Sequence, residues 1–414
     1  MSDQNNPPTT QITETIGSGP TSCQGGLKKY LCNRRNPWIT KALLLTACGI
    51  IVVVGVQILF TSTQAQTDKL FSDWRPNNET KGLSYVGSKT CVECHAPVAK
   101  QLLTPMAQAL ETAPDCRILN RRGRLTFRNG PYTYQISREG KDFIYSVTDG
   151  VNEIKKPILY CFGEGHVGQT YLFRHNDLLY ETRVSYFQKL QSLNFTIGHR
   201  ESVPTSLEDA LGRAIGAEET QQCFGCHTTG AVNGFQLNLD QLRAGIGCEA
   251  CHGPGEKHLL AVKAKKSGDL QIYNPGRLGA HDLSQSFCGT CHISFEQAML
   301  LPGQSGINNI RFQPYRIFNS RGHNTNDSRI ACLACHDPHD KLQKETSYYD
   351  AKCLACHLSK PTETKTTKRT AAACPIKTSN CTTCHMPKVE LPGMHAQFTD
   401  HWIRIVKPNE PTPR

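Results

Sequence analysis

One pentapeptide, Cys-x-x-Cys-His, occurs seven times between residues 91 and 385 and contains 14 of the 20 cysteines of the chain. We number the copies from the first to the seventh motif in chain order. Their cysteine pairs are Cys91 and Cys94, Cys223 and Cys226, Cys248 and Cys251, Cys288 and Cys291, Cys332 and Cys335, Cys353 and Cys356, and Cys381 and Cys384. The histidines that end them are His95, His227, His252, His292, His336, His357 and His385. The groups that these seven motifs bind must therefore form part of the interior of the folded chain.

The spacing within the motif has a chemical reason. Two thiols one helical turn apart can form thioethers with the two vinyl groups of one haem, and the next residue can place its imidazole on the iron. Zinc ribbons also use CxxC pairs but need no histidine after the second cysteine. A disulfide framework is typical of small domains, and this chain has 414 residues. The sequence therefore predicts seven covalently bound haem c groups.

The composition agrees with haem filling the interior. Hydrophobic residues make up 38% of the chain, which is lean for this length. The segment from Cys91 to His401 provides about 44 residues per motif, too few to insulate one haem from the next. The formal charge of +11 falls to about +4 once each ferric haem brings roughly one net negative charge from its propionates. We therefore expect no nucleic-acid partner.

Nine histidines lie outside the motifs and are candidates for the second axial ligand of each iron. A bis-histidine iron is an electron carrier, whereas a five-coordinate iron can bind a substrate. The favoured distal ligands are His258, His323, His339, His395 and His401. Two weaker candidates are His166, in a Gly-rich turn, and Met106, 11 residues after His95. These histidines could instead hydrogen-bond a haem propionate, and Met106 could instead be a core residue.

The N-terminal part of the chain contains a candidate membrane span. Residues 42–60 are 19 uncharged residues, which as a helix extend roughly 28 Å, close to the thickness of a bilayer core. Lys and Arg precede this run, so the positive-inside bias places the N-terminus in the cytoplasm. The alternative is a signal peptide cleaved near Thr63-Gln64-Ala65. Both interpretations export the motifs.

The predicted fold is a mainly α and irregular multihaem scaffold with an antiparallel β insert and one N-terminal transmembrane helix. In residues 124–200, apolar and polar residues alternate between Asn-Gly, Glu-Gly and Asp-Gly pairs, which indicates hairpins. We expect these segments: 1–38 cytoplasmic, 39–61 membrane anchor, 62–85 linker, 86–300 a tetrahaem module with the β insert at about 124–200, 301–406 a trihaem module, and 407–414 a tail.

Six cysteines are left outside the motifs. Cys23, Cys32 and Cys48 fall in the cytoplasmic or membrane segments, whereas Cys116, Cys161 and Cys374 follow them. One disulfide among the last three is possible, but the sequence does not say which. Free buried thiols are the simpler expectation.

Several stretches around the motifs are more specific than the repeat itself. They are YVGSKTCVECH (85–95), CFGCHTTG (223–230), GIGCEACHGPGEKH (245–258) and FCGTCH (287–292). In order and spacing this part resembles the tetrahaem cytochromes c that serve hydroxylamine oxidoreductase. The later stretches CLACHDPH (332–339), CTTCHMPK (381–388) and HAQFTDHWI (395–403) look like larger multihaem cytochromes that share this module. The resemblance covers roughly residues 83–407.

The resemblance implies a largely helical scaffold with mostly bis-histidine irons. It implies that His258 crosses to another haem, that of the first motif, and that the haem of Cys223, Cys226 and His227 is five-coordinate. Relatives commonly carry a histidine near the position of Met106, so this chain departs from the pattern there.

The function favoured by these patterns is a membrane-anchored heptahaem c-type cytochrome in the inner membrane, with its haem domain on the periplasmic side. It would carry electrons between a membrane or periplasmic donor and a terminal acceptor. Its partners would be other redox proteins: a quinol-oxidising complex, cytochromes or a terminal reductase. The first alternative is an oxidoreductase with one five-coordinate haem acting on a small nitrogen or sulfur compound. A structural subunit of a larger haem complex is the second.

Overall fold

The computed structural model describes residues 83–234, 236–301, 306–323, 330–357, 374–407, 409–410 and 412–413. The chain divides into two compact units, Met1–Thr63 and Gln64–Arg414, and all of the described residues belong to the second. The predicted cytoplasmic segment, the membrane anchor, nearly all of the linker and the three N-terminal cysteines lie outside the described residues. Within the described ranges, the structure has no helix of the length and apolarity that a membrane span requires.

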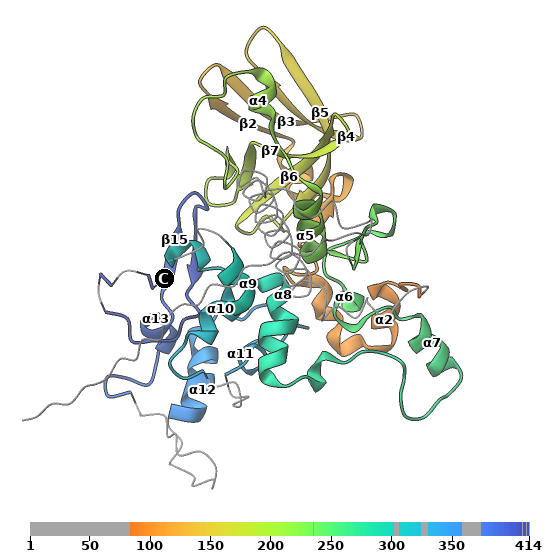
Figure 1. Cartoon of the computed structure of the whole chain (residues 1–414), viewed down its shortest axis with the longest axis vertical. Coiled ribbons are helices and arrows are strands. Elements are labelled where there is room, and N and C mark those ends of the chain that lie inside the picture. Colours follow the sequence, from red (N-terminus) through yellow and green to blue (C-terminus); the bar gives the residue numbers. More distant parts are fainter. Residues whose placement is uncertain are drawn as a thin grey trace, which may run out of the picture. The chain divides into compact units, whose positions relative to one another are not determined.

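The largest element is a ten-stranded sheet in which all neighbouring strands are antiparallel (Figure 1). Its main path runs β10-β7-β6-β5-β4-β3-β2, with β1 added to β5 and the β8-β9 hairpin added to β6. The strands are β1 (Leu110–Thr112), β2 (Arg124–Asn129), β3 (Tyr132–Glu139), β4 (Asp142–Thr148), β5 (Glu153–Phe162), β6 (Gly168–His175), β7 (Leu178–Thr182), β8 (Val184–Phe187), β9 (Ser192–Phe195) and β10 (Gly212–Ala214).

Sequence alternation explains how the sheet forms. Tyr132, Tyr134 and Ile136 on β3 are buried, and the polar residues between them point to the other face. Gly130 and Gly140 turn the chain into the next strand with φ of 58° and 62°, a region that favours glycine. The buried faces build an aromatic-rich apolar cluster that includes residues from β2 to β9 and from α3 and α4.

The helices are short, and each of the seven motifs lies in or at the end of one. They are α2 (Ser88–Cys94), α3 (Arg117–Arg122), α4 (Leu207–Leu211), α5 (Ala217–His227), α6 (Cys248–His252), α7 (Glu256–Lys263), α8 (Gly289–His292), α9 (Phe295–Leu300), α10 (Gln313–Phe318), α11 (Cys332–Cys335), α12 (Thr346–His357) and α13 (Cys381–His385). The π-helix η6 (Asp282–Cys288) leads into α8. The 3-10 helices are η2 (Ala96–Leu103), η3 (Ala113–Asp115), η4 (Leu239–Gln241), η5 (Pro275–Arg277) and η7 (Gly306–Asn309).

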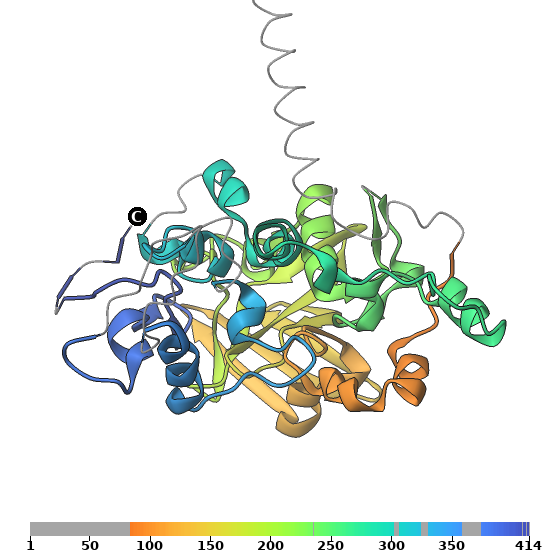
Figure 2. The same ribbon diagram turned by 90° about the horizontal axis from the view of Figure 1, so that it is seen from below.

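Three small two-stranded sheets connect these helices. They pair β11 (Thr228–Thr229) with β14 (Arg243–Ala244), β12 (Val232–Asn233) with β13 (Gln236–Leu237), and β15 (Lys388–Leu391) with β16 (Ala396–Thr399). In Figure 1 the labelled motif helices lie below the large sheet, from α2 on one side to α12 and α13 on the other, and Figure 2 shows the same elements from below.

Protein side chains alone give most motif helices no apolar core. α2, α11 and α13 have no buried residue, and the only buried residue of α12 is Asp350. α5 is different, because its Phe224 is fully buried in a second apolar cluster against the sheet. Helices of four to twelve residues do not persist without packing. These helices therefore fit a chain in which a large apolar group supplies the missing contacts.

Candidate functional site

Cysteines of different motifs are brought into direct contact. Cys91 of the first motif and Cys248 of the third are hydrogen-bond partners, and burial followed by the Cys248 thiol raises the pKa of Cys91 to about 12. The same type of contact joins Cys288 of the fourth motif to Cys332 of the fifth. The first cysteines of the sixth and seventh motifs also form such a pair. Three pairs of motifs therefore touch through their attachment thiols.

Further contacts connect these pairs. Cys226 Sγ of the second motif lies 3.8 Å from the carbonyl oxygen of Thr290, inside the fourth motif. The pKa of the Cys288 thiol is raised mainly by its hydrogen bond with Cys332 and by burial. Cys251 of the third motif is close enough to Cys288 to add to this increase. The same electrostatic proximity links the fifth motif to the sixth through Cys335 and Cys353. All seven motifs thus form one connected series, 1–3–4–5–6–7, with the second motif joined to the fourth.

The histidines form pairs with a characteristic separation. The ring centroids of His95 and His258 are 6.3 Å apart, those of His252 and His339 are 6.1 Å apart, and those of His336 and His401 are 6.2 Å apart. A metal binds an imidazole nitrogen at about 2 Å and the ring centre lies about 1 Å further, so two imidazoles on opposite sides of one metal have centres about 6 Å apart. Each pair contains one motif histidine and one histidine from elsewhere, as haem ligation requires.

Hydrogen bonds orient these imidazoles. Five histidines donate Nδ1–H to a backbone carbonyl: His227 to Ala109, His252 to Tyr273, His258 to Leu270, His385 to Arg404 and His401 to Thr399, at 2.8 to 3.0 Å. This bond selects the tautomer that leaves Nε2 available to a metal.

Burial also favours the ligating form of the ring. It is the main cause that lowers the pKa of His227, His252, His292, His323 and His336, and it lowers that of His401 to about 4. Only the neutral imidazole binds a metal, so these residues are held ready at neutral pH.

Other histidines have Nε2 engaged by protein. His175 Nε2 lies 2.9 Å from Glu208 Oε2, and His199 Nε2 lies 3.0 Å from Glu181 Oε2. His395, a favoured candidate of the sequence, has its Nε2 3.0 Å from Asn194 Nδ2 and its ring against Phe187. The Nε2 of His395, the nitrogen that a metal would need, is therefore bonded to a residue of the sheet and does not face a motif.

His323 has a partner that sequence reasoning did not select. Its ring centroid lies 6.5 Å from that of His281, which is not among the distal ligands that the sequence favoured. The phenyl ring of Phe318 packs against His323 at 5.0 Å and also contacts His281. The position of His281, seven residues before the fourth motif, was the one signal in the sequence. No local pattern indicated that it would contact His323.

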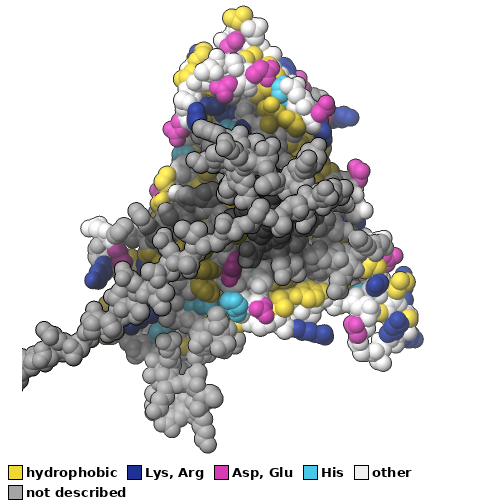
Figure 3. Space-filling view, in the orientation of Figure 1, with side chains coloured by type: hydrophobic (Ala, Val, Ile, Leu, Met, Phe, Trp, Pro, Cys, Tyr) yellow, Lys and Arg dark blue, Asp and Glu magenta, His cyan; other side chains and the backbone are white. Residues whose placement is uncertain are grey.

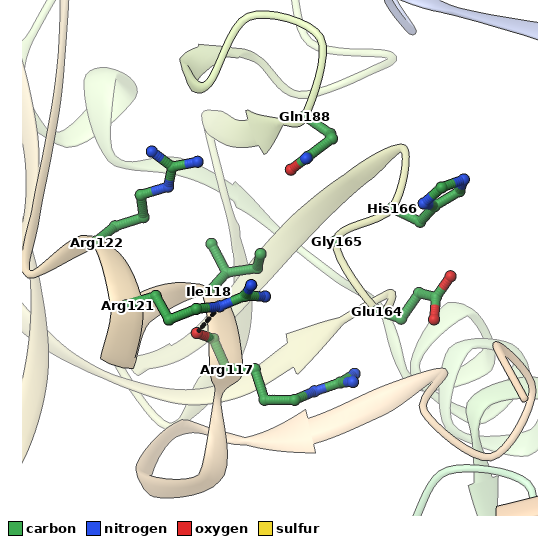
Figure 4. A pocket seen from close by; sticks show the side chains of 8 residues that line it. All are labelled: Arg117, Ile118, Arg121, Arg122, Glu164, Gly165, His166 and Gln188. Atoms are coloured by element: carbon green, nitrogen blue, oxygen red, sulfur yellow. Dashed lines mark hydrogen bonds between the residues drawn. The ribbon is translucent and has the colours of Figure 1, made fainter. Parts of the chain in front are cut away.

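The two weaker candidates lie in different surroundings. His166 lines a cavity of about 390 Å³ together with Arg117, Ile118, Arg121, Arg122, Glu164, Gly165 and Gln188. Figure 4 shows Glu164 and His166 on a loop facing the arginines of α3. Met106 is partly buried, and its carbonyl accepts the N–H groups of Ala109 and Ile246. Neither residue is brought against a motif histidine by a contact that the structure defines.

Glu249, inside the third motif, has a structural role that the sequence did not reveal. Its buried carboxylate accepts three backbone N–H groups, from Val86, Gly87 and Gly255, each at 2.8 Å. The carboxylate therefore docks the start of α2, the helix that contains both cysteines of the first motif, onto the third motif.

Histidine side chains also reach the surface over the motif helices, as the lower half of Figure 3 shows. Within the described part of the chain, no group of three or more His, Cys, Asp and Glu side chains is arranged to hold a bare metal ion. The motif thiols and paired imidazoles instead fit a macrocyclic iron group bound between them.

Comparison with known proteins gives one family match. A family model described as "Cytochrome c554 and c-prime" matches residues 183–253, which contain the second and third motifs. Among solved structures, the outer cell wall cytochrome OcwA is 17% identical over 48% of this chain, with a TM-score of 0.25. That similarity covers 37% of OcwA, so the match spans little more than a third of that protein. No curated protein matches. The repeated motif and the family match together support a multihaem, electron-transferring c-type cytochrome with covalently bound haem c.

Proposed function

We propose that the chain is a membrane-anchored heptahaem c-type cytochrome. It carries electrons one at a time along its series of haems, between a membrane or periplasmic donor and a terminal acceptor. The donor and acceptor are other redox proteins: a quinol-oxidising complex, another cytochrome or a terminal reductase. The apolar run of residues 42–60 anchors the chain in the inner membrane and places the seven motifs on the periplasmic side.

The connected series of motifs carries this proposal. Each motif touches at least one other through an attachment cysteine or the backbone beside it. A bound haem supplies reversible one-electron chemistry. The chain's role is to hold successive attachment sites in contact, so that no segment of protein insulates one from the next.

The paired histidines indicate what three of the seven sites do. His258, His339 and His401 lie at the distance from motif histidines at which each pair would hold one haem iron between its two rings. Each such pair would hold a bound iron from both sides and would leave no position on it for a substrate. Sites of this kind are suited to passing electrons rather than to converting a molecule.

Haem stoichiometry tests the proposal. Exported, purified protein should give seven haems per chain in a pyridine haemochrome assay. Single Cys→Ala variants, one for each motif, should each be lighter than the wild type by the mass of one haem. A wild-type value of four or fewer would overturn the heptahaem assignment. Anchoring is tested separately by recovering the full-length chain from washed membranes, with an N-terminal sequence that precedes residue 42.

One observation favours an oxidoreductase as second candidate. In the described part of the chain, the ring centroids of His227 and Phe162 are 5.2 Å apart, and no second imidazole faces His227 at the separation seen in the three pairs. The guanidinium of Arg311 is close enough to act electrostatically on both His227 and His292. Such a site can admit a small anionic nitrogen or sulfur compound. A high-spin electron paramagnetic resonance signal that nitrite abolishes would support this candidate, and a fully low-spin spectrum would exclude it.

A further inference from the structure

Two cysteines outside the motifs meet in the core of the sheet. Cys116 lies between η3 and α3, and Cys161 lies on β5. Both are fully buried and belong to the same apolar cluster. Cys161 is hydrogen-bonded to the Cys116 thiol, although 45 positions separate the two residues in the chain. The sequence left open which of its spare cysteines could meet, and the fold brings these two together.

The backbone holds the pair in place from both sides. β1 pairs with β5 so that Glu111 stands opposite Cys161. The η3 turn then carries the chain from β1 back to Cys116. The Cys116 thiol also lies 3.0 Å from Gln169 Oε1. Gln169 keeps its two donated hydrogen bonds, to Glu111 and to the Gly163 carbonyl, whichever partner Cys116 takes.

Neither a metal nor catalysis accounts for the pair. Among the described residues no third Cys, His, Asp or Glu completes a metal site. Burial, reinforced by the Cys116 thiol, raises the pKa of Cys161 well above its usual value. The reactive thiolate is therefore suppressed once the sheet has closed. A bond between the two sulfurs must form while the chain is still folding, and burial then protects it from exchange.

We propose that Cys116 and Cys161 form a structural disulfide in the exported protein. Formation removes one proton and one electron from each thiol, and the two electrons reduce the disulfide of an exported thiol–disulfide oxidoreductase to its dithiol. The inference rests on the export of the haem domain that the proposed function includes. It does not depend on the number of haems.

The bond would support the second motif as well as the sheet. It links the residues after β1 to β5 beside Ala109, whose carbonyl accepts both the Gly163 N–H and the Nδ1–H of His227. It also closes the loop that contains β2, β3 and β4, which lowers the entropy of the unfolded chain.

Peptide mapping of the full, haem-loaded protein tests the proposal. The protein is unfolded without reductant in the presence of iodoacetamide and digested with trypsin. Peptides 101–117 and 156–174, which contain no motif, should appear as one species joined through Cys116 and Cys161. The exposed Cys374 should be alkylated in the same sample, which confirms that the reagent worked. Reduction before alkylation should release the two peptides, each carrying one alkyl group.

Alkylation of both Cys116 and Cys161 without reduction would overturn the inference. Haem content of the same sample separates the two proposals: full haem with two free thiols rejects only the disulfide, whereas missing haem with an intact disulfide rejects only the heptahaem function. The double variant C116A/C161A should unfold at a lower denaturant concentration than the C374A control. Wild-type unfolding should shift in the same direction with a phosphine reductant, and unfolding of the double variant should not.

Discussion

Arg316 and Asp400 form an ion pair that is completely shielded from solvent, with Nε–Oδ1 at 2.8 Å and Nη2–Oδ2 at 2.7 Å. Arg316 belongs to α10, and Asp400 directly precedes His401. Ser320 strengthens the same connection, because its hydroxyl donates to the His401 carbonyl at 3.2 Å. The pair therefore fixes the segment that brings His401 to His336.

Asp400→Asn should destabilise this segment strongly. The substitution leaves the buried guanidinium of Arg316 without its counter-charge, which typically costs about 3–5 kcal/mol. We expect a lower midpoint of guanidinium unfolding and an altered spectrum of the haem bound at the fifth motif. Asp340→Asn is the matched control. Asp340 pairs with Lys100 at the surface and accepts the backbone N–H of its neighbour Lys341, so its loss of charge should change stability by less than about 1 kcal/mol. Equal effects of the two substitutions would contradict the role of the buried pair.

Asp400 should also make stability depend on acid pH. Burial acts to raise the pKa of Asp400, but the hydrogen bond from Arg316 and further interactions outweigh it, so the pKa is lowered. The folded state then keeps the carboxylate ionised where the unfolded chain, with a pKa of about 3.9, becomes protonated. This contribution is present above about pH 4 and is lost as the pH falls through the lowered value. Denaturant midpoints between pH 7 and pH 3 should fall less in Asp400→Asn than in the wild type; parallel curves would argue against it.

His258→Ala should remove one axial ligand. His258 faces His95 across 6.3 Å, and its Nδ1 is held by the Leu270 carbonyl. We expect about one high-spin iron per chain in the electron paramagnetic resonance spectrum. His258→Met should restore a low-spin iron with a higher midpoint potential.

His175→Ala is the control for this experiment. His175 is buried, but its Nε2 is bound to Glu208 rather than facing a motif. It should leave every haem spectrum unchanged. A high-spin signal in His175→Ala, or none in His258→Ala, would show that the pairs of imidazoles do not report ligation.

Glu249→Gln should loosen the contact between the first and third motifs. The amide retains one oxygen acceptor but places an N–H₂ group opposite backbone donors that the carboxylate now accepts. We expect a loss of about 1.5–3 kcal/mol, the typical worth of a hydrogen bond to a charged group. Glu256→Gln is a matched control, because the partly exposed Glu256 accepts one backbone N–H, from Ser84. It should change stability by about 0.5 kcal/mol or less. Denaturant unfolding of both variants measures the difference.

Local patterns were sufficient for two features of the chain. The attachment motifs could be read directly, because thioether formation depends on two cysteines and a histidine within five residues. The strands of the sheet follow a two-residue alternation that Tyr132, Tyr134 and Ile136 display, and glycine marks their turns. Both signals depend only on residues that are close together in the sequence, so they can be recognised without knowledge of the fold.

The partners of the ligand histidines were decided by tertiary structure. The sequence patterns favoured His395 and His401 alike as distal ligands, yet the fold turns His395 toward Asn194 and His401 toward His336. His258 meets His95 from 163 positions away. Such pairings depend on which helices pack together, and that packing is set by contacts such as Glu249 with Val86 or Arg316 with Asp400, whose partners no local pattern identifies. Thus the sequence by itself determined where the seven attachment motifs lie, because each motif is a short-range covalent pattern, and only the tertiary structure decided which side chains face each motif, because that is a matter of long-range packing.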